Sequence, residues 1–217
     1  MLNTAINDQT SLADSRGLSD FDRPHRLVVN YVYQLPFLAR ASGWKGKALA
    51  RWEIGGITLL QSGAPFTVFD SRGGTAYGVA SGTPVVTASL APGATLQSAQ
   101  TSGGIGSRLD HYLDPAAFVT APIVGIDGST GFGTLGRNTF RGPHQQNWDV
   151  SLGKSWHVRE RQSLRFNADF FNMWNHASFA NPASPSGVDV RLPGSFAAIT
   201  STTGTPRIVQ FSGRYSF

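Results

Sequence analysis

The sequence predicts an all-β protein, organised as an antiparallel meander of about five long strands. Three observations lead to this fold class. Only 14% of the residues are charged, and the 217-residue chain contains 25 glycines but 2 methionines, a composition that does not suit a helical protein. Apolar and polar side chains alternate with a period of two in several stretches. The connections between these stretches are short and long in turn.

The alternation places the strands near residues 24–37, 47–62, 146–158, 162–175 and 206–217. In the first strand, Leu27, Val29 and Tyr31 share one parity, and Asn30 and Gln34 share the other. In the second strand the apolar parity changes after Gly55 and Gly56, which predicts a β-bulge at the glycines. The fourth strand carries its apolar stripe as far as Trp174, and the fifth is "RIVQFSGRYSF", which alternates up to the final residue.

The connections suggest a membrane barrel. The segments "LARASGWKG" and "RERQ" are short, whereas residues 64–146 and 177–205 are long and rich in Gly, Ser, Thr, Ala and Pro. Bacterial outer-membrane barrels combine short periplasmic turns with long extracellular loops, and strands of about ten residues span their apolar band of roughly 25 Å. We therefore expect a loop segment at 1–22 and a barrel segment at 23–217, with irregular loops that pack poorly.

Two other all-β architectures compete with this interpretation. A soluble secreted β-sandwich that binds carbohydrate also alternates along its strands. Asn, Gln, Asp, Ser and Arg recur on the polar faces, however, and Trp and Tyr lie toward the ends of the apolar faces, as in the aromatic girdle of a barrel. A complete small porin is disfavoured, because bacterial single-chain barrels have an even number of strands, at least about eight.

The sequence gives little support to other functional classes. The chain has no cysteine, and its net charge of +5 comes from scattered basic residues, which disfavours nucleic-acid binding. "GFGTLG" lacks the strand and helix of a dinucleotide site, and "GKS" lies inside an alternating strand. The five histidines are isolated, and no nucleophile motif or carboxylate pair appears, so we expect no cofactor, no metal and no enzymatic activity. The first residues do not form a signal peptide.

Two local structures are also expected. Asp114 and Pro115 in "LDPAAF" predict one helical turn, with Asp114 as its N-cap. Asp20 and Asp22 are expected to form an ion-pair cluster with the nearby Arg23 and Arg26.

Several motifs, in order, resemble the C-terminal region of TonB-dependent outer-membrane receptors, in the subgroup with a carboxypeptidase-regulatory-like domain. They are "SDFDRPHRLVVNYVYQLPF", "GGITLLQSGAPFTV", "YLDPAAF", "GTLGRNTFRGPHQQNWDVSLGKSW" and "LRFNADFFNMWNHASFANP". The resemblance implies a 22-stranded barrel, a plug and a box that engages TonB. Signal peptide, box, plug and most of the barrel have no counterpart here, so we expect an open C-terminal segment of such a barrel, a truncated product or a fragment.

The resemblance also implies a location and partners. The parent receptor would lie in the bacterial outer membrane and import a siderophore, a glycan or a peptide. The partners would be outer-membrane lipid, the barrel assembly machinery, and the plug and other strands of the parent. TonB would be engaged only through the missing N-terminal region.

The family topology implies that the C-terminal end lies at the periplasmic face, and the parity of the alternation assigns the two sides of each strand. Residues expected to form an assembly signal are Val209, Phe211, Tyr215 and Phe217. Residues expected to face lipid are Leu27, Val29, Tyr31, Trp52, Val150, Leu152, Phe166 and Phe170, together with Phe211. Residues expected to face the lumen are Asn30, Gln34, Arg51, Glu53, Asp149, Arg165, Asn167, Asp169 and Arg214.

Overall fold

The computed structural model describes residues 7, 8, 10, 16–36, 43–183 and 188–217, and these form two compact units. We call one the sheet unit; it comprises His25–Ser62, His144–Ser178 and Thr203–Phe217. We call the other the loop unit; it comprises Met1–Pro24, Gly63–Pro143 and Phe179–Thr202. The sequence suggested a single barrel segment from residue 23 onward, whereas the long connections form a unit of their own.

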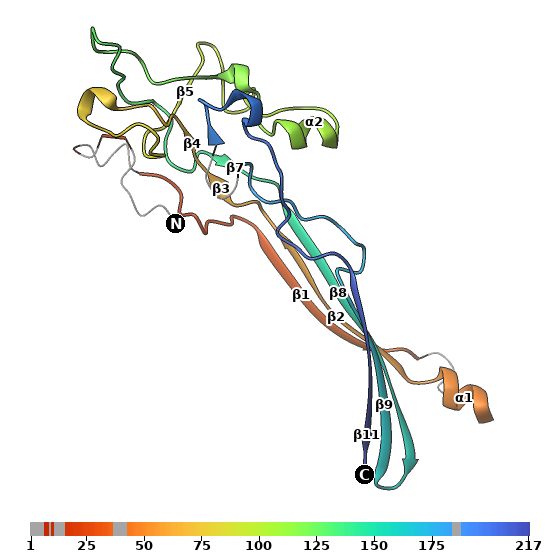
Figure 1. Ribbon diagram of the computed structural model, residues 1–217. Coiled ribbons are helices and arrows are strands. Elements are labelled where there is room, and N and C mark those ends of the chain that lie inside the picture. Colours follow the sequence, from red (N-terminus) through yellow and green to blue (C-terminus); the bar gives the residue numbers. More distant parts are fainter. Residues whose placement is uncertain (1–6, 9, 11–15, 37–42, 184–187) are drawn as a thin grey trace. The chain divides into compact units, whose positions relative to one another are not determined.

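The sheet unit contains five long strands that run side by side (Figure 1). They are β1 (Arg26–Gln34), β2 (Trp52–Gln61), β8 (Gln145–Arg159), β9 (Gln162–Phe171) and β11 (Ile208–Ser216). Their order in the sheet is β1-β2-β8-β9-β11, and every neighbouring pair is antiparallel. The five-stranded antiparallel meander is therefore confirmed. The sheet is open, with β1 and β11 as its edges among the described residues.

The second strand begins later than the sequence suggested. Residues Gly43–Leu49 form helix α1, and Arg51 then takes a left-handed conformation with φ of 60° before β2 starts at Trp52. The expected strand start near residue 47 is wrong, because Ala, Leu and Lys in this stretch are good helix formers and their spacing also satisfies a short alternation. Residues 37–42 of this connection lie outside the described part of the chain.

The fourth strand ends earlier than expected. Strand β9 stops at Phe171, because Asn172 adopts a left-handed φ of 48° and turns the chain. The Asn172 side chain holds this turn: its Oδ1 accepts the His176 backbone N–H at 2.9 Å, and its Nδ2 donates to the His176 carbonyl at 3.1 Å. Trp174 consequently lies in the turn and not on the apolar stripe of a strand, as the alternation had suggested.

The loop unit is assembled from very short elements. Two-residue strands pair as β3 (Pro65–Phe66) with β7 (Phe140–Arg141), β4 (Val68–Phe69) with β10 (Val188–Asp189), and β5 (Ser89–Leu90) with β6 (Phe118–Val119). Its helices are α2 (Ile105–Asp110) and the 3-10 turns η1 (Thr75–Tyr77), η2 (Pro115–Ala117) and η3 (Pro193–Ser195). The helical turn predicted in "LDPAAF" is confirmed as η2, because the Asp114 carboxylate accepts the Ala116 N–H at 2.9 Å.

A hydrophobic core fills the loop unit. Leu113, Val68, Val86 and Val188 are fully buried. Phenylalanine rings pack edge-on or tilted against one another in this core: the ring centroids of Phe118 and Phe140 are 5.5 Å apart, and those of Phe118 and Phe196 are 5.3 Å apart. The expectation that these loops pack poorly is therefore wrong. Apolar residues that are far apart in the sequence form this core. Periodicity does not predict them, because each strand of the loop unit has only two residues.

Ion pairs connect the N-terminal residues to the rest of the loop unit. Arg137 pairs with Asp20 at 3.1 Å, and Arg141 pairs with Asp22. The Asn138 side chain also donates to Asp20 at 2.7 Å. The expected cluster of these aspartates with Arg23 and Arg26 is not formed: the partners lie more than a hundred residues away in sequence, a distance over which spacing gives no information.

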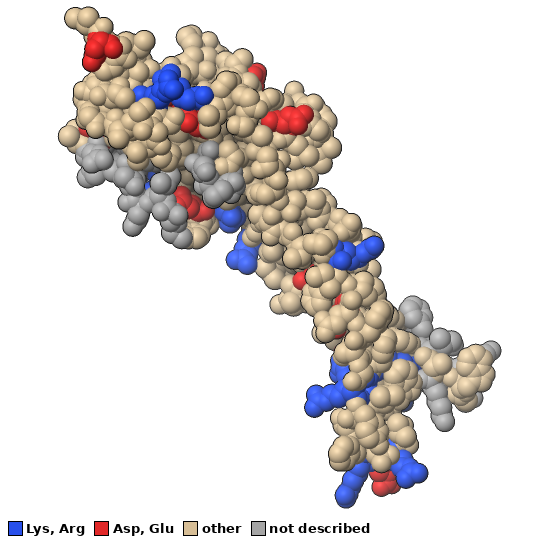
Figure 2. Space-filling model, viewed as in Figure 1, with Lys and Arg blue, Asp and Glu red and all other residues tan. Residues whose placement is uncertain are grey.

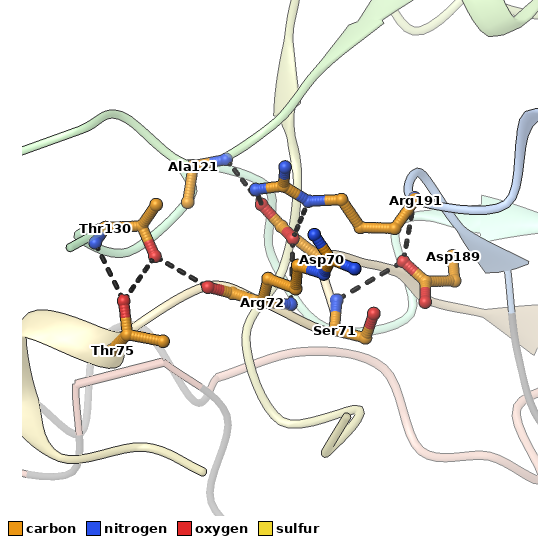
Figure 3. A network of polar contacts seen from close by, with 8 residues as sticks. All are labelled: Asp70, Ser71, Arg72, Thr75, Ala121, Thr130, Asp189 and Arg191. Atoms are coloured by element: carbon orange, nitrogen blue, oxygen red, sulfur yellow. Dashed lines mark hydrogen bonds and ion pairs between the residues drawn. The ribbon is translucent and has the colours of Figure 1, made fainter. Parts of the chain in front are cut away.

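The most deeply buried charge in the loop unit is Asp70, which is fully buried (Figure 3). Its two carboxylate oxygens accept from Arg191 Nε at 2.7 Å and Arg191 Nη2 at 3.0 Å. The backbone N–H groups of Ala121 and Arg72 complete the site at 2.8 and 3.0 Å. Asp189 accepts in turn from the Ser71 N–H at 3.2 Å. The network thus joins three separate segments of the chain around one carboxylate.

These contacts keep Asp70 ionised. Burial raises the pKa of its carboxyl, but the bonds from Arg191 and from the Ala121 and Arg72 N–H groups lower it by more, so that the net pKa lies below its ordinary value. A carboxyl whose pKa is lower in the folded state stabilises the fold above its unfolded pKa of about 4. That contribution is lost as the pH falls through the folded-state pKa.

Replacement of Asp70 should loosen the loop unit. Asp70→Asn leaves the partly buried Arg191 guanidinium without its counter-charge, and we expect the free energy of unfolding to fall by about 3 kcal/mol. Hydrogen exchange at residues 66–70 and 188–191, measured at pH 7, should become faster.

Asp127→Asn is the matched control, because the exposed Asp127 accepts an N–H from Ser129 at 3.1 Å and pairs with no arginine of the described part of the chain. It should leave the exchange unchanged. Equal acceleration in both variants would contradict the structural role of the Asp70–Arg191 pair.

Candidate functional site

The register of the sheet gathers the apolar side chains of all five strands on one face. One row crosses the whole sheet as Tyr31, Gly56, Val150, Phe170 and Val209, each paired with the next. Because directly paired residues point to the same side, the parity of every strand follows from this row. The next row toward the β8–β9 turn on this face is Tyr33, Ile54, Leu152, Ala168 and Phe211.

We call this side the apolar face. It contains every residue that the sequence assigned to lipid: Leu27, Val29, Tyr31, Trp52, Val150, Leu152, Phe166, Phe170 and Phe211. Val209 and Tyr215 share it, and Phe217 lies just beyond the end of β11. Several of its side chains are open to solvent, Phe211 being 67% and Leu27 54% exposed. Such a continuous apolar surface calls for an apolar environment.

Aromatic rings cover much of this face. Phe166 and Phe211 stack with centroids 6.1 Å apart, and Trp52 meets the edge of Phe166 at 6.5 Å. Tyr215 and Phe217 stack at 6.1 Å near the end of the chain. Offset and edge-on ring pairs of this kind stabilise neighbouring strands beyond the area that they bury.

The apolar parity of β2 changes without a bulge, so Ile57 and Leu59 lie on the polar face. The register runs unbroken on both sides of β2, so the predicted bulge at Gly55 and Gly56 is wrong. Gly56 belongs to the apolar face, and the Tyr31 ring lies over it: a Cβ added to Gly56 would come within 2.6 Å of both the Tyr31 hydroxyl and the Asp149 carbonyl. The glycine therefore leaves room for a tyrosine on the neighbouring strand.

One basic residue lies on the apolar face, and the sequence analysis missed it. Lys154 pairs with Trp52 and Phe166, and it is 3% exposed. Its ammonium group donates to the Ala50 carbonyl and lies 5.5 Å from the Trp52 ring centroid and 5.4 Å from that of Trp156. Two indole rings thus shield the charge. The signal in the sequence was the parity of Lys154, which matches that of Leu152 and Trp156.

The opposite side of the sheet, here called the polar face, carries the other predicted set. It includes Asn30, Gln34, Glu53, Asp149, Arg165, Asn167, Asp169 and Arg214. Arg51 is the exception, because it precedes β2 in a left-handed conformation and belongs to neither strand face. A few apolar side chains also occur here, among them Val32 and Ile57.

The acidic groups of the polar face are paired. Ser151 Oγ donates to Asp169 Oδ1 at 2.5 Å, and the Asn172 N–H donates to Asp149 Oδ1 at 2.9 Å. Arg165 donates to Glu53 at 3.4 Å and to the Asn167 amide oxygen at 3.1 Å. Figure 2 shows basic and acidic side chains at the end of the sheet where β8 turns into β9, and further basic side chains along the sheet.

Two hollows lie toward opposite ends of the sheet. One, of about 510 Å³, is lined by charged residues that include Arg51, Glu53 and Arg165. The other, of about 350 Å³, is lined by amide and hydroxyl side chains near the start of β8. No group of three metal-ligating side chains occurs among the described residues. "GKS" lies within β8, and "GFGTLG" lies between β6 and β7, with no helix between the motif and β7.

The sheet unit is therefore an open antiparallel sheet with one apolar and one polar face. Comparison with protein families gives a match to the outer membrane beta barrel domain over residues 2–210. The chain belongs to this family. It is accordingly an outer-membrane β-barrel domain, which favours the barrel interpretation over the soluble sandwich. Comparisons with curated proteins and with solved structures gave no match. In the described part of the chain, no helix is long and apolar enough to cross a membrane.

The contact between Tyr31 and Gly56 can be tested with neighbouring glycines. Gly56→Ala should destabilise the barrel domain by about 1–3 kcal/mol, because its Cβ has no room beside the Tyr31 ring and the Asp149 carbonyl. Thermal unfolding in detergent, followed by tryptophan fluorescence, measures the change.

Gly55→Ala is the control, since its Cβ would meet nothing closer than the Tyr31 carbonyl at 3.6 Å. It should be neutral or slightly stabilising. If Gly55→Ala proved as harmful as Gly56→Ala, the loss would reflect glycine in the strand and not the tyrosine contact.

Proposed function

We propose that this barrel domain is the C-terminal part of a TonB-dependent outer-membrane receptor, whose complete barrel imports a bulky nutrient. The observation that carries the proposal is the open amphipathic sheet, whose two edges have no partner strand in the described part of the chain, combined with the series of motifs that resembles this receptor group. The family match supports the outer-membrane barrel, and the receptor role is the finer inference.

The sheet edges support a larger barrel. The outer edges of β1 and β11 have no partner strand in the described residues, and their backbone N–H and C=O groups are left without a ladder there. In a bilayer each such group costs several kcal/mol, so strands cross membranes only as closed barrels. Further strands, from the parent protein in our proposal, would pair with both edges and close the wall.

In a closed barrel, the apolar and polar faces of the sheet would have different surroundings. The apolar face would contact lipid, and the polar face would line the lumen, where Asp149, Asp169 and Arg165 can be solvated or paired. The β8–β9 turn and the β1–β2 connection lie at the same end of the sheet as the C-terminal residue of β11. We assign this end to the periplasm and the end that continues into the loop unit to the outside of the cell.

The last strand would serve assembly as well as structure. Val209, Phe211 and Tyr215 alternate on the apolar face of β11, and Phe217 is 94% exposed at the terminus. We assign these four residues to recognition by the barrel assembly machinery. Insertion of a Phe217→Ser variant at the wild-type level, measured by heat-modifiable migration in isolated outer membranes, would contradict this role.

The orientation of the faces can be tested with two adjacent residues. Val150→Arg places a charge toward lipid and should cost about 2–4 kcal/mol near the bilayer midplane. Ser151→Arg points to the lumen beside Asp169 and should cost much less. The measurement is urea-induced unfolding from lipid vesicles. Equal losses of stability in the two variants would contradict the assignment of the faces. A larger loss for Ser151→Arg would show that the two faces are exchanged.

The receptor role is tested by the size of the native protein. An antibody against residues 207–217 should detect, in outer membranes of the source cells, a heat-modifiable protein several times larger than 23.2 kDa. This size would reflect the plug and the additional strands. A single band near 23.2 kDa would overturn the receptor proposal, while outer-membrane fractionation of that band would leave the barrel family assignment intact.

A further inference from the structure

The neutral hollow of the sheet unit is built by three segments of the chain. The start of β8 contributes Gln145–Asn147, the turn after β9 contributes Asn172, His176 and Ser178, and the approach to β11 contributes Thr203–Thr205. Leu59 of β2 completes the lining. Its volume of about 350 Å³ falls in the range of roughly 300–1,000 Å³ that is typical of small-molecule sites.

Hydrogen bonds among these segments hold the hollow open. Asn172 is 8% exposed, and its side chain donates to the Thr205 carbonyl at 2.9 Å. Ser178 Oγ donates to the Gln146 carbonyl at 3.1 Å, and the Gln145 amide donates to Thr203 Oγ1 at 3.1 Å. Because these hydrogen bonds already order the wall of the hollow, a ligand would not lose binding free energy to order it.

The lining is free of formal charge. No Asp, Glu, Lys or Arg is among the described residues that line this hollow, in contrast to the hollow at the other end of the sheet with its Arg51, Glu53 and Arg165. A charged ligand would lose water here without gaining a counter-ion. Amides and hydroxyls both donate and accept hydrogen bonds, as the hydroxyl groups of a sugar do.

Part of this capacity is available to a ligand. Within the described residues, the side chains of Asn147, His176 and Thr205 make no hydrogen bond. His176 and Thr205 are exposed and Asn147 is half-buried. These groups come from all three segments of the wall, so a ligand in the hollow would be contacted from several sides.

We propose that this hollow binds an uncharged, polyhydroxylated ligand, an oligosaccharide, on the extracellular side of the barrel wall. The inference rests on the proposed receptor function and names the substrate class of that receptor. It selects a neutral glycan over a charged metal chelate or a charged peptide, because only the neutral ligand matches a lining of amides and hydroxyls.

The test uses the protein extracted from outer membranes in detergent. Isothermal titration calorimetry with maltohexaose, cellohexaose, xylohexaose and arabinohexaose should detect binding of at least one of them. Asn147→Ala and His176→Ala should each weaken that binding roughly 3- to 10-fold, the effect of one lost hydrogen bond. Gln210→Ala removes an amide from the polar face of β11 outside the hollow and should leave the affinity unchanged.

The charged probes are ferric citrate and hexagalacturonic acid, and the neutral peptide probe is an acetylated, amidated Gly-Ser repeat of six residues. None of them should bind in a manner sensitive to Asn147→Ala. Failure of all four neutral oligosaccharides to bind, equal weakening by Gln210→Ala, or Asn147-dependent binding of a charged or peptide probe would each overturn the inference. Heat-modifiable migration of the variants confirms their folding, and the immunoblot for native size tests the receptor proposal separately.

Discussion

The cross-strand register from Tyr31 through Gly56, Val150 and Phe170 to Val209 is the constraint on which the rest of the sheet depends. A shift of one residue between any two strands would turn all the side chains of one strand to the opposite face. The shifted strand would then place polar side chains on the apolar face and apolar side chains on the polar face. The register is continuous across β2, and Gly56 leaves room for the Tyr31 ring of the neighbouring strand.

The two units obtain their stability in different ways. The sheet has little enclosed interior of its own, and its largest side chains are open on the apolar face, so that its environment must supply the burial. The loop unit encloses a core around Leu113 and Val188 and ties its segments together with Asp70 and Arg191. The sheet unit therefore depends on its surroundings for burial, whereas the loop unit buries its own core.

Charged groups on both faces of the sheet have partners that compensate for their charge or hydrogen-bond to them. On the apolar face, the ammonium group of Lys154 is enclosed by Trp52 and Trp156 and bonded to a backbone carbonyl. On the polar face, acidic groups take neutral donors or Arg165 as partners. The hollow near the start of β8 is lined without formal charge, which makes it chemically distinct from the charged hollow at the other end of the sheet.

The sequence by itself determined the existence of the five strands, their antiparallel order and, apart from Arg51 and the residues after Gly56 in β2, which residues share a face. Period-two alternation is a local property that each strand carries in its own residues. It also predicted the η2 turn from Asp114 and Pro115. Only the tertiary structure decided that Gly56 makes room for Tyr31, that Asp20 pairs with Arg137, and that Asp70 and Arg191 hold together a folded loop unit. The partners in these contacts are 25 to more than 100 residues apart, and neither periodicity nor spacing carries information about which distant groups meet in space.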